Sequence, residues 1–423
     1  MFQCWNSQKL KMYFLRFLIP SEIRSVFQNH SYRHYFSGYS ATLLGNWIQR
    51  TGIGLIAWDL TRSEFFLGLV AFCELIPTLF FGPIGGAIGD RVPTKQLITY
   101  TQFLLMLQSI LLAISVYTGF LTPGLLLVLV FLQGIILSFA QPAGALMSPA
   151  LVDKNQIPTA IAISTMAFNI SRFLGPMIAI VIVLWVGVGG LFLANSLGFV
   201  WYLWCLRRLR LRAEHDPVSE KSTSLWQQIK DGLSYSLKHA QISVSLLIVL
   251  LGTLFARPVI DMFPAFADKI FDHGARGFSW LLASMGIGAF LAGLFLSQFS
   301  KRYMLYIPAI SLLFIGISLC CFIASPFLWL GCIFSSFLGF SFVMNGIGCL
   351  MVIQSTVRPD MRSRAVSLYY LSFRGGLAAG GALLGLLSEQ FGLKPVFIAT
   401  AIICFFVSLA LIKKISGRDS RSK

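Results

Sequence analysis

The chain has 423 residues, of which 56% are hydrophobic and 12% are charged, and its mean hydropathy is +0.77. Soluble chains carry about a quarter charged residues, so this composition excludes an ordinary soluble enzyme. The net charge of +17 would fit a nucleic-acid-binding protein. However, the basic residues are concentrated in the segments between apolar runs, which argues against nucleic acid as a partner.

Apolar runs long enough to cross a bilayer as helices recur along the whole chain. Because a helix satisfies its own backbone hydrogen bonds in lipid, these runs predict helices. The predicted spans are residues 34–58, 65–88, 96–118, 124–148, 157–184, 189–206, 242–266, 278–299, 303–324, 327–353, 364–388 and 394–412. We therefore expect an all-α membrane protein with twelve transmembrane helices in two six-helix bundles, embedded in the lipid bilayer as a monomer.

One long polar stretch divides the chain into two halves. It is rich in charge, contains Pro217 and predicts an amphipathic helix on the cytoplasmic face, because four of its apolar residues are spaced four apart. These residues are Leu225, Ile229, Leu233 and Leu237. The predicted parts are a cytoplasmic tail at 1–33, a first bundle at 34–206, the linker at 207–240, a second bundle at 241–414 and a cytoplasmic tail at 415–423.

The distribution of lysine and arginine predicts the orientation in the membrane. Most of the 33 lie in the tails, the linker and every second loop, on one side of the predicted membrane. The loops of the other side carry only Arg62, Lys269, Arg276 and Lys394. The positive-inside rule then places both termini in the cytoplasm, and we expect a multi-pass protein of a bacterial inner membrane.

A short pattern occurs once in each half. LLGNWIQR ends at Arg50, and LLGTLFAR ends at Arg257, 207 positions later. Gly86 and Gly293 are separated by the same 207 positions. Both arginines lie inside predicted spans, where an arginine at the bilayer centre costs about 2.5–3.5 kcal/mol. The repeat predicts two pseudo-symmetric bundles of parallel topology, and such a pair usually holds its substrate between the halves near mid-membrane.

The loop between the second and third predicted spans contains a spaced set of small and charged residues, Gly86, Asp90, Arg91 and Lys95. This set resembles the signature G-x-x-x-D-R-x-G-R-[RK] of the major facilitator superfamily, with Pro93 in place of the usual glycine and Thr94 in place of a basic residue. The resemblance implies the major facilitator fold and a cytoplasmic latch between conformations. The alternative is an ordinary basic loop that fixes topology.

Three further segments, residues 45–50, 168–176 and 366–369, look like the branch of that superfamily that contains enterobactin exporters and macrolide efflux pumps. Gly175 and Pro176 are similar to the fifth-span helix-packing motif of drug–proton antiporters, in which two closing glycines are replaced here by Ala179 and Ile180. The resemblance implies export of a small molecule in exchange for protons.

Four arginines lie within predicted spans, namely Arg50, Arg172, Arg257 and Arg374. In one interpretation, acids neutralise them. Arg257 and Asp261 are four apart on one predicted helix and can pair, while Glu74 and Asp59 can take two more. At best three acids then serve four arginines. The other interpretation is therefore a central substrate site that favours anions such as carboxylates or catecholates.

Other polar residues inside spans are candidates for the same site. Glu74 and Asp261 are predicted to couple transport to protons, because ionisable groups inside a membrane mark proton pathways. The alternative is that each is a fixed partner of an arginine. Gln49 and Asn169 lie within one helical turn of an in-span arginine, so we expect them to line the substrate site.

No catalytic, metal or cofactor site is predicted. The five histidines lack ligand spacing, the cysteines form no CxxC or Cys/His cluster, and no Walker A phosphate loop occurs. The sequence therefore predicts a secondary active transporter and not an enzyme. The predicted function is proton-coupled efflux of a small organic compound by alternating access, with an anionic siderophore as substrate. The alternatives are a multidrug or macrolide efflux pump and an importer of a siderophore-like anion.

Overall fold

The computed structural model describes residues 21–89, 91–209, 233–297, 306–358 and 361–419. Within these ranges every regular element is a helix, as the apolar runs predict. Asp90 of the predicted latch and most of the predicted linker helix lie outside the described residues.

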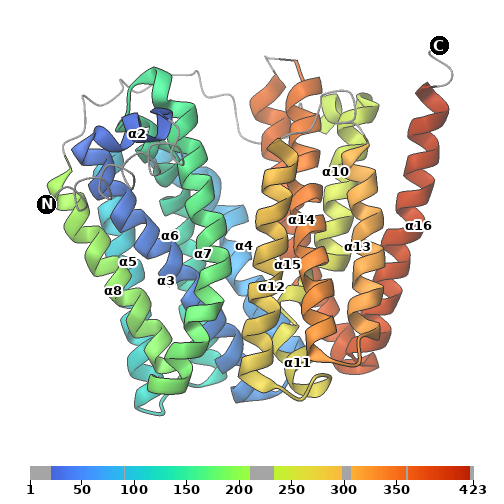
Figure 1. The fold of residues 1–423 in the computed structure, drawn as a ribbon, viewed down its shortest axis with the longest axis horizontal. Coiled ribbons are helices and arrows are strands. Elements are labelled where there is room, and N and C mark those ends of the chain that lie inside the picture. Colours follow the sequence, from blue (N-terminus) through green and yellow to red (C-terminus); the bar gives the residue numbers. More distant parts are fainter. Residues whose placement is uncertain (1–20, 90, 210–232, 298–305, 359–360, 420–423) are drawn as a thin grey trace, which may run out of the picture.

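The first half of the chain forms a bundle of long helices (Figure 1). They are α3 (His30–Thr61), α4 (Glu64–Gly89), α5 (Thr94–Tyr117), α6 (Pro123–Ala150), α7 (Ile157–Val186) and α8 (Gly189–Arg208). A short helix, α2 (Ser21–Gln28), precedes them, and a 3₁₀ turn (Lys154–Gln156) leads into α7.

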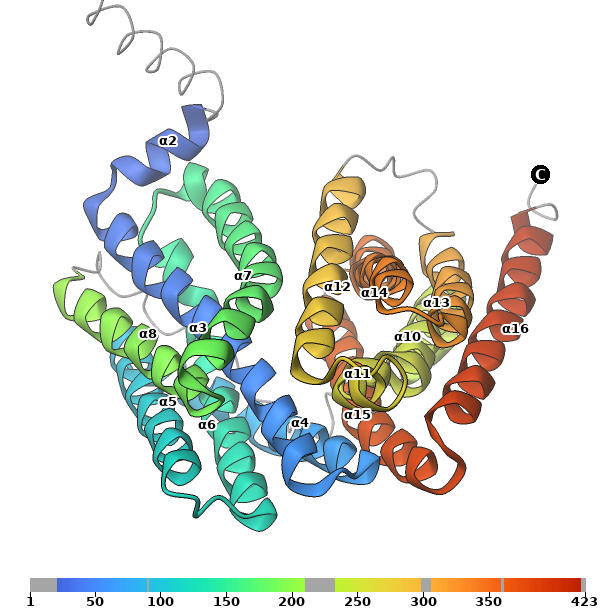
Figure 2. The same cartoon turned by 60° about the horizontal axis from the view of Figure 1, so that its bottom comes forward.

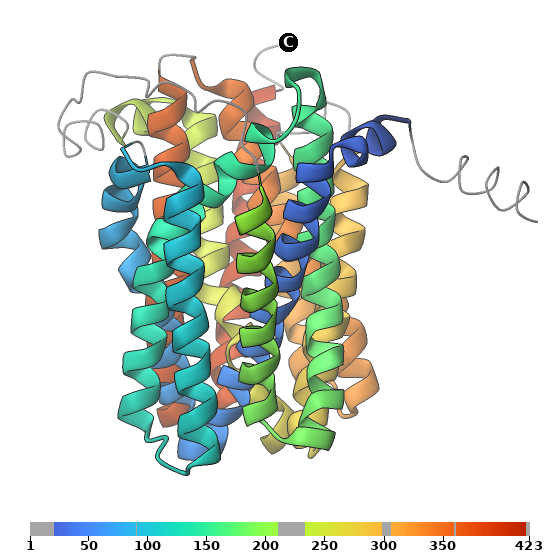
Figure 3. The ribbon, with the colours of Figure 1, turned by 90° about the vertical axis from the view of Figure 1, so that its left-hand side faces the viewer.

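The second half forms a matching bundle beside the first (Figure 1). Its helices are α10 (Ala240–Leu251), α11 (Phe263–Lys269), α12 (Gly274–Ser297), α13 (Ile307–Ala324), α14 (Leu328–Thr356), α15 (Arg362–Phe391) and α16 (Leu393–Asp419). The helix α2 and the end of α16 lie at one end of the molecule, called here the terminal end, and α11 lies near the opposite, distal end (Figures 1 and 3).

Eleven segments of the described chain are long and apolar enough to cross a membrane. The remaining predicted span, α3, has 32 residues but also carries Asn46, Gln49 and Arg50, which lower its hydropathy. Large apolar side chains cover the outer surface, with Trp185 84% exposed, as expected for a surface that contacts lipid. The chain is therefore a multi-pass membrane protein, and the all-α fold class predicted from the sequence is confirmed.

Helical structure begins earlier than the predicted first span at residue 34. Val26 on α2 and Tyr32 on α3 are both 0% exposed. Asn29 between them accepts hydrogen bonds from the backbone N–H groups of Ser31 and Tyr32, and its side-chain amide donates to the Leu151 carbonyl at the end of α6. This cap explains why the chain turns there: the Asn side chain satisfies donors at the helix N-terminus that have no partner inside the helix.

The repeated glycine of the two LLG patterns makes the same kind of close contact in both halves. A Cβ built on Gly45 would lie 2.3 Å from the side-chain oxygen of Asn195, and one on Gly252 would lie 2.9 Å from that of Asn345. Each glycine thus makes room for a buried asparagine on a neighbouring helix.

The seventh predicted span, expected as one helix at 242–266, is broken in the middle. The chain passes from α10 through a π-helical segment (Gly252–Ala256) and a 3₁₀ segment (Arg257–Ile260) before α11 begins. Pro258 lacks a backbone N–H and cannot continue the α-helical ladder, which accounts for the break. The corresponding helix of the first half, α3, is continuous.

The two halves meet along two helix pairs, α4 with α15 and α7 with α12. Figure 2 shows α4 and α15 side by side where the two bundles meet. Glycines allow the closest contacts: a Cβ on Gly68 of α4 would lie 2.1 Å from the Gly381 carbonyl oxygen of α15, and one on Gly385 would lie 2.8 Å from the Glu64 carbonyl oxygen. Because α4 begins at the distal end, this contact closes the distal end between the halves.

Candidate functional site: arginines between the two halves

Three of the four in-span arginines meet near the middle of the molecule. The charges of Arg50 on α3 and Arg257 on the 3₁₀ segment act on Arg172 of α7, and Arg50 also acts on Arg257. The guanidinium carbons of Arg50 and Arg172 lie 5.8 and 5.6 Å from the ring centre of Trp47. Arg50 and Arg172 come from the first half and Arg257 from the second, so the cluster spans the boundary between the halves.

Two carboxylates accompany this cluster. An oxygen of Asp261 lies 3.3 Å from a guanidinium nitrogen of Arg50, and this ion pair joins the two halves. Glu74 on α4 acts electrostatically on both members of that pair. In the centre of the protein, 42% of the Arg50 side chain is still exposed, so it faces a space between the halves rather than lipid.

Asp261 is not in ion-pair contact with Arg257, although the charges of the two residues still act on each other. The ion pair of Asp261 in the described residues is with Arg50, 211 positions away in the sequence. The expectation assumed an α-helix, in which residues four apart share a face. The chain from Arg257 to Ile260 is a 3₁₀ helix with three residues per turn, so residues four apart no longer align.

Neither Arg172 nor Arg257 has an acid within ion-pair distance among the described residues, although the charge of Asp261 acts on Arg257. Arg172 is only 5% exposed, and its Nε has no hydrogen-bond partner there. The guanidinium carbon of Arg257 lies 5.7 and 5.1 Å from the ring centres of Phe342 and Phe373, which stabilise a cation without cancelling its charge. The site therefore combines three guanidiniums with two carboxylates and has a cationic surplus.

Arg374, the fourth in-span arginine, lies apart from the central three. It is half-buried on α15 and donates a hydrogen bond to the side-chain oxygen of Gln141 on α6. The groups that act on its charge in the described structure do not include the central arginines. Three of the four in-span arginines therefore lie together, and Arg374 does not join them.

Gln49 lies inside the first bundle and away from the central space. It is 2% exposed, and its amide donates to Gln108 and Gln133 at 3.1 and 2.9 Å. Its carbonyl oxygen accepts from Ser109 and Asn195 at 2.6 and 2.8 Å. All its hydrogen-bonding capacity is thus used to join α3 to α5, α6 and α8, and in this conformation none is left for a substrate.

Asn169 on α7 is half-buried. Its side-chain amide donates a hydrogen bond to the Thr165 carbonyl of the same helix at 3.1 Å. The neighbouring Phe168 is 42% exposed and packs edge-to-face on Trp47 at 5.9 Å between ring centres. An aromatic pair therefore lies against the cationic cluster.

Gly175 positions α7 for this arrangement. A Cβ at Gly175 would lie 2.4 Å from the Cβ of Trp47, so only glycine lets α7 approach α3 this closely. Pro176 follows inside the same helix. The packing contact places Arg172, one turn earlier on α7, beside Trp47.

The described residues of the predicted latch, Gly86, Arg91 and Lys95, lie at the terminal end of α4 and α5. Nothing lies within 4 Å of a Cβ built on Gly86, and Arg91 is exposed. The Lys95 ammonium donates to the carbonyl of Leu209 at 2.7 Å, which caps the C-terminal end of α8 in the same half. In the described part of the chain, the terminal end thus shows no closing contact between these residues and the second half.

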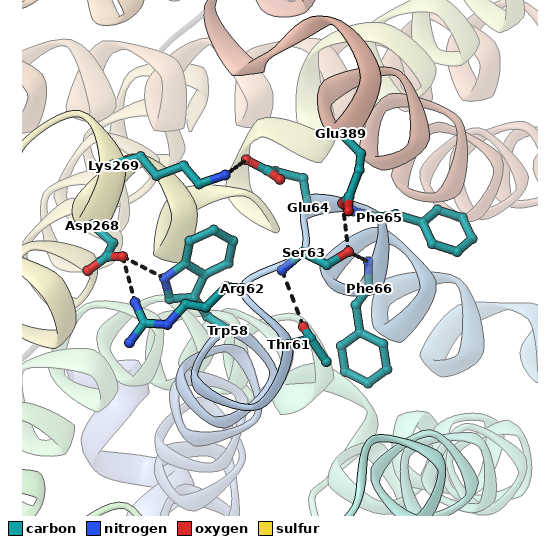
Figure 4. A network of polar contacts seen from close by, with 10 residues as sticks. All are labelled: Trp58, Thr61, Arg62, Ser63, Glu64, Phe65, Phe66, Asp268, Lys269 and Glu389. Carbon is teal, nitrogen blue, oxygen red and sulfur yellow. Dashed lines mark hydrogen bonds and ion pairs between the residues drawn. The ribbon is translucent and has the colours of Figure 1, made fainter.

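The distal end carries a network of charges that joins the halves (Figure 4). Arg62 pairs with Asp268 at 2.6 Å, and the Trp58 indole N–H donates to the same carboxylate at 3.1 Å. Lys269 pairs with Glu64 at 2.6 Å. Because Arg62 and Glu64 belong to the first half and Asp268 and Lys269 to the second, we call these four residues the distal gate.

A third carboxylate, Glu389 at the end of α15, extends the network. It accepts hydrogen bonds from the Ser63 hydroxyl at 2.6 Å and from the Phe65 backbone N–H at 3.0 Å (Figure 4). Ser63 and Phe65 lie at the start of α4, so Glu389 holds α15 to the turn between α3 and α4.

The distal gate is not among the features predicted above, although the sequence contains a signal for it. Arg62 and Lys269 are 207 positions apart, the same offset that relates Arg50 to Arg257. Each cation reaches a carboxylate of the opposite half, so the gate follows the internal duplication.

Comparison with known protein families identifies the family to which this chain belongs. A family model described as transmembrane secretion effector, within the major facilitator superfamily, matches residues 24–421. The chain belongs to this family of major facilitator transporters. It is a membrane transporter of small molecules and not an enzyme, as the sequence predicted.

Two relatives cover most of the transporter. The staphyloferrin A transporter of Staphylococcus aureus is 25% identical over 378 residues, which is 86% of this chain and 91% of that protein. Macrolide efflux protein A of Streptococcus pyogenes is 20% identical over 389 residues, 91% of this chain and 96% of that protein.

Solved structures share the fold. The nucleoside transporter NupG superposes with a TM-score of 0.65 at 14% identity, covering 90% of this chain and 98% of that one. A bacterial homologue of the lysosomal transporter Spinster, solved in an inward-facing and unoccupied conformation, gives a TM-score of 0.69 at 13% identity, covering 93% and 96%.

Proposed function

We propose that this transporter exports a small organic anion, with an anionic siderophore as the favoured cargo, across the inner membrane of a bacterium in exchange for protons. The observation that carries the proposal is the surplus of guanidinium groups between the halves. Three arginines face two carboxylates there, and Arg172 is 5% exposed without an acidic partner in the described structure.

A buried cation without a partner is costly, so a protein that keeps one usually has a use for it. A carboxylate or catecholate group would supply the missing negative charge, and the planar guanidinium offers two parallel N–H donors to it. Trp47 and Phe168 beside the arginines would pack against the organic part of such a molecule.

Orientation and relatives support export. The positive-inside rule makes the terminal end cytoplasmic, and in this structure the closing contacts lie at the distal end. The central site would then be reached from the cytoplasm. The match to transmembrane secretion effectors and the similarity to a macrolide efflux protein and to a staphyloferrin A transporter agree with this direction and cargo class.

Glu74 and Asp261 are the proposed proton-coupling residues. Both lie within electrostatic reach of Arg50, which a substrate anion would also approach. Rocking of the two halves about the central site would alternate access, with the distal gate closed in one state and a latch around Gly86, Asp90, Arg91 and Lys95 closed in the other. The transporter is proposed to work as a monomer.

Import of the same class of anion is the second candidate, and the ion pair between Arg50 and Asp261 favours it. An anion that displaced Asp261 from Arg50 would leave a carboxylate without its cation, and such a carboxylate binds a proton more readily. Anion and proton would then bind together and move in the same direction, as in a symporter.

Drug efflux is the alternative that the macrolide efflux relatives support. The experiment that separates the three functions is a deletion strain assayed for siderophore in the medium and in the cytoplasm, together with its susceptibility to macrolides. The strain is complemented with the wild type, with Arg172→Gln and with Arg24→Gln as a control for loss of an exposed positive charge on α2.

For anion export, deletion lowers extracellular and raises cytoplasmic siderophore, and Arg24→Gln restores secretion while Arg172→Gln does not. Unchanged secretion with raised macrolide sensitivity would overturn the anion proposal in favour of drug efflux. Unchanged secretion with impaired uptake of the siderophore would establish import instead.

A further inference from the structure

A cavity of 680 Å³ lies between α4 and α6 of the first half and α15 of the second. Its polar lining includes Gln141, Arg364, Tyr370 and Arg374. The lining segments belong to the later parts of α4 and α6 and to the start of α15, so the cavity lies toward the terminal end. We call it the side cavity.

The described lining of the side cavity contains the guanidinium of Arg374 and neither Asp nor Glu. The hydrogen bond from Arg374 goes to the amide oxygen of Gln141, which is neutral and leaves the charge of the guanidinium in place. The hydroxyl groups of Ser138 and Thr78 in the same wall donate to backbone carbonyls of their own helices, so they offer an anion no free donor. The side cavity is therefore cationic through Arg374.

The side cavity adjoins the central site. Thr78 in its wall is one helical turn beyond Glu74 on α4, about 5–6 Å along the helix axis. Arg374 in its wall directly follows Phe373, whose ring contacts Arg257. An anion held at Arg374 would thus be near the central arginines but on their terminal side.

We propose that the side cavity is a second anion-binding site, in which Arg374 holds a carboxylate-bearing organic anion on its way to the central arginines. The inference rests on the proposed function, since it assumes an anionic cargo that arrives from the terminal end. It gives a role to Arg374, which lies on α15, the helix that corresponds to α7 with Arg172, but lines a separate cavity.

The test uses the purified full-length transporter with Leu371, an exposed residue of the cavity wall, replaced by cysteine. The rate of maleimide labelling at position 371 is measured with and without citrate as the probe anion. Labelling of the native cysteines, measured in the parent chain, is subtracted. We expect citrate to slow labelling several-fold. Arg374→Gln should abolish this protection, whereas Arg374→Lys, which keeps the charge, and Arg24→Gln should retain it.

The decisive background is the double variant Arg172→Gln with Arg257→Gln, which disables the central site. Citrate should still protect position 371 there. If protection is lost in this background and kept in Arg374→Gln, the anion is held only at the centre. That result overturns the side cavity as a binding site and leaves the proposed function intact, because the latter is judged by secretion from cells.

The oxyanion chemistry of the site would also suit a lipid headgroup, so the labelling is repeated in nanodiscs. Protection by citrate in nanodiscs of zwitterionic lipid alone supports the proposal. Protection that requires an anionic lipid such as phosphatidylglycerol, and that citrate does not produce, would show that the cavity holds a headgroup and would overturn its role in cargo transport.

Discussion

The distal gate and the central site both place arginine or lysine between the two halves, but these cations differ in their burial and in whether an acid pairs with them. Each gate cation has a carboxylate of the opposite half within 2.6 Å, and the two cations are 55% and 48% exposed. In the central site, Arg172 is 5% exposed and has no acidic partner among the described residues.

This difference indicates that the two regions have different functions in transport. An exposed ion pair such as that of Arg62 with Asp268 contributes about 0–1 kcal/mol, so this part of the gate can form and break in every transport cycle. A buried cation without an acidic partner does not stabilise the resting protein and is better explained by a ligand that arrives with the opposite charge. The distal gate would open and close during the transport cycle, and the central site would bind the anionic substrate.

The largest effect is expected for Arg172→Gln, which removes the unpaired charge. Truncating one partner of a buried charge pair costs about 2–5 kcal/mol, so binding of an anionic cargo should weaken by at least about tenfold. Isothermal titration of purified protein with the secreted anion checks this, with Arg24→Gln as the matched control. Binding within a factor of two of the wild type would remove Arg172 from the substrate site.

Glu74→Gln should abolish uphill transport while leaving exchange of labelled for unlabelled anion across the membrane. The amide keeps the size of the side chain but cannot bind and release a proton, so the coupling step fails and the carrier still moves. Proteoliposomes with and without an imposed proton gradient measure both activities. Full gradient-driven transport by this variant would make Glu74 a structural residue.

Gly68→Ala should favour a state with the distal end open. The added Cβ would lie 2.1 Å from a backbone oxygen of Gly381, which cannot move without its helix, so α4 and α15 must separate. Spin labels at Thr118 and Lys394, near the distal ends of the two halves, should report a longer distance. Gly144→Ala is the control, because nothing lies within 4 Å of its Cβ; an unchanged distance in Gly68→Ala would show that this contact does not hold the gate.

Asp268→Asn should have the smallest effect. Exposed pairs measure about 0.2–1 kcal/mol, so the balance between closed and open gate should shift by about a factor of five or less. The same spin-label pair, measured in Arg62→Gln, Asp268→Asn and the double variant, gives the interaction of the two residues. A shift in Asp268→Asn as large as that of Gly68→Ala would show that ion pairs, and not helix packing, keep the distal end shut.

The features that the sequence predicts well depend on composition along one helix at a time. Apolar length places the helices, and the 207-residue offset finds the duplication that puts Arg50 and Arg257 at matching positions. The break in the seventh span also has a local signal, because Gly252 and Pro258 are poor α-helix formers, but the hydropathy of the segment conceals it.

The features that the sequence does not reveal depend on which way a helix faces. Gln49 and Arg50 are neighbours, yet one is enclosed by four hydrogen bonds inside a bundle and the other faces the space between the halves. Arg172 and Arg374 lie on corresponding helices of the two halves, α7 and α15, yet only Arg172 joins the central cluster. Helix rotation is set by packing against several partners at once, and no single-helix pattern encodes it.

The central claim is that the unpaired arginines recognise negative charge. Its most direct test is the binding of citrate and of its uncharged trimethyl ester to the purified transporter, measured by titration calorimetry in the wild type and in Arg172→Gln. The account predicts that the wild type binds citrate in preference to the ester and that Arg172→Gln loses most of this preference. Equal binding of acid and ester by the wild type would contradict it.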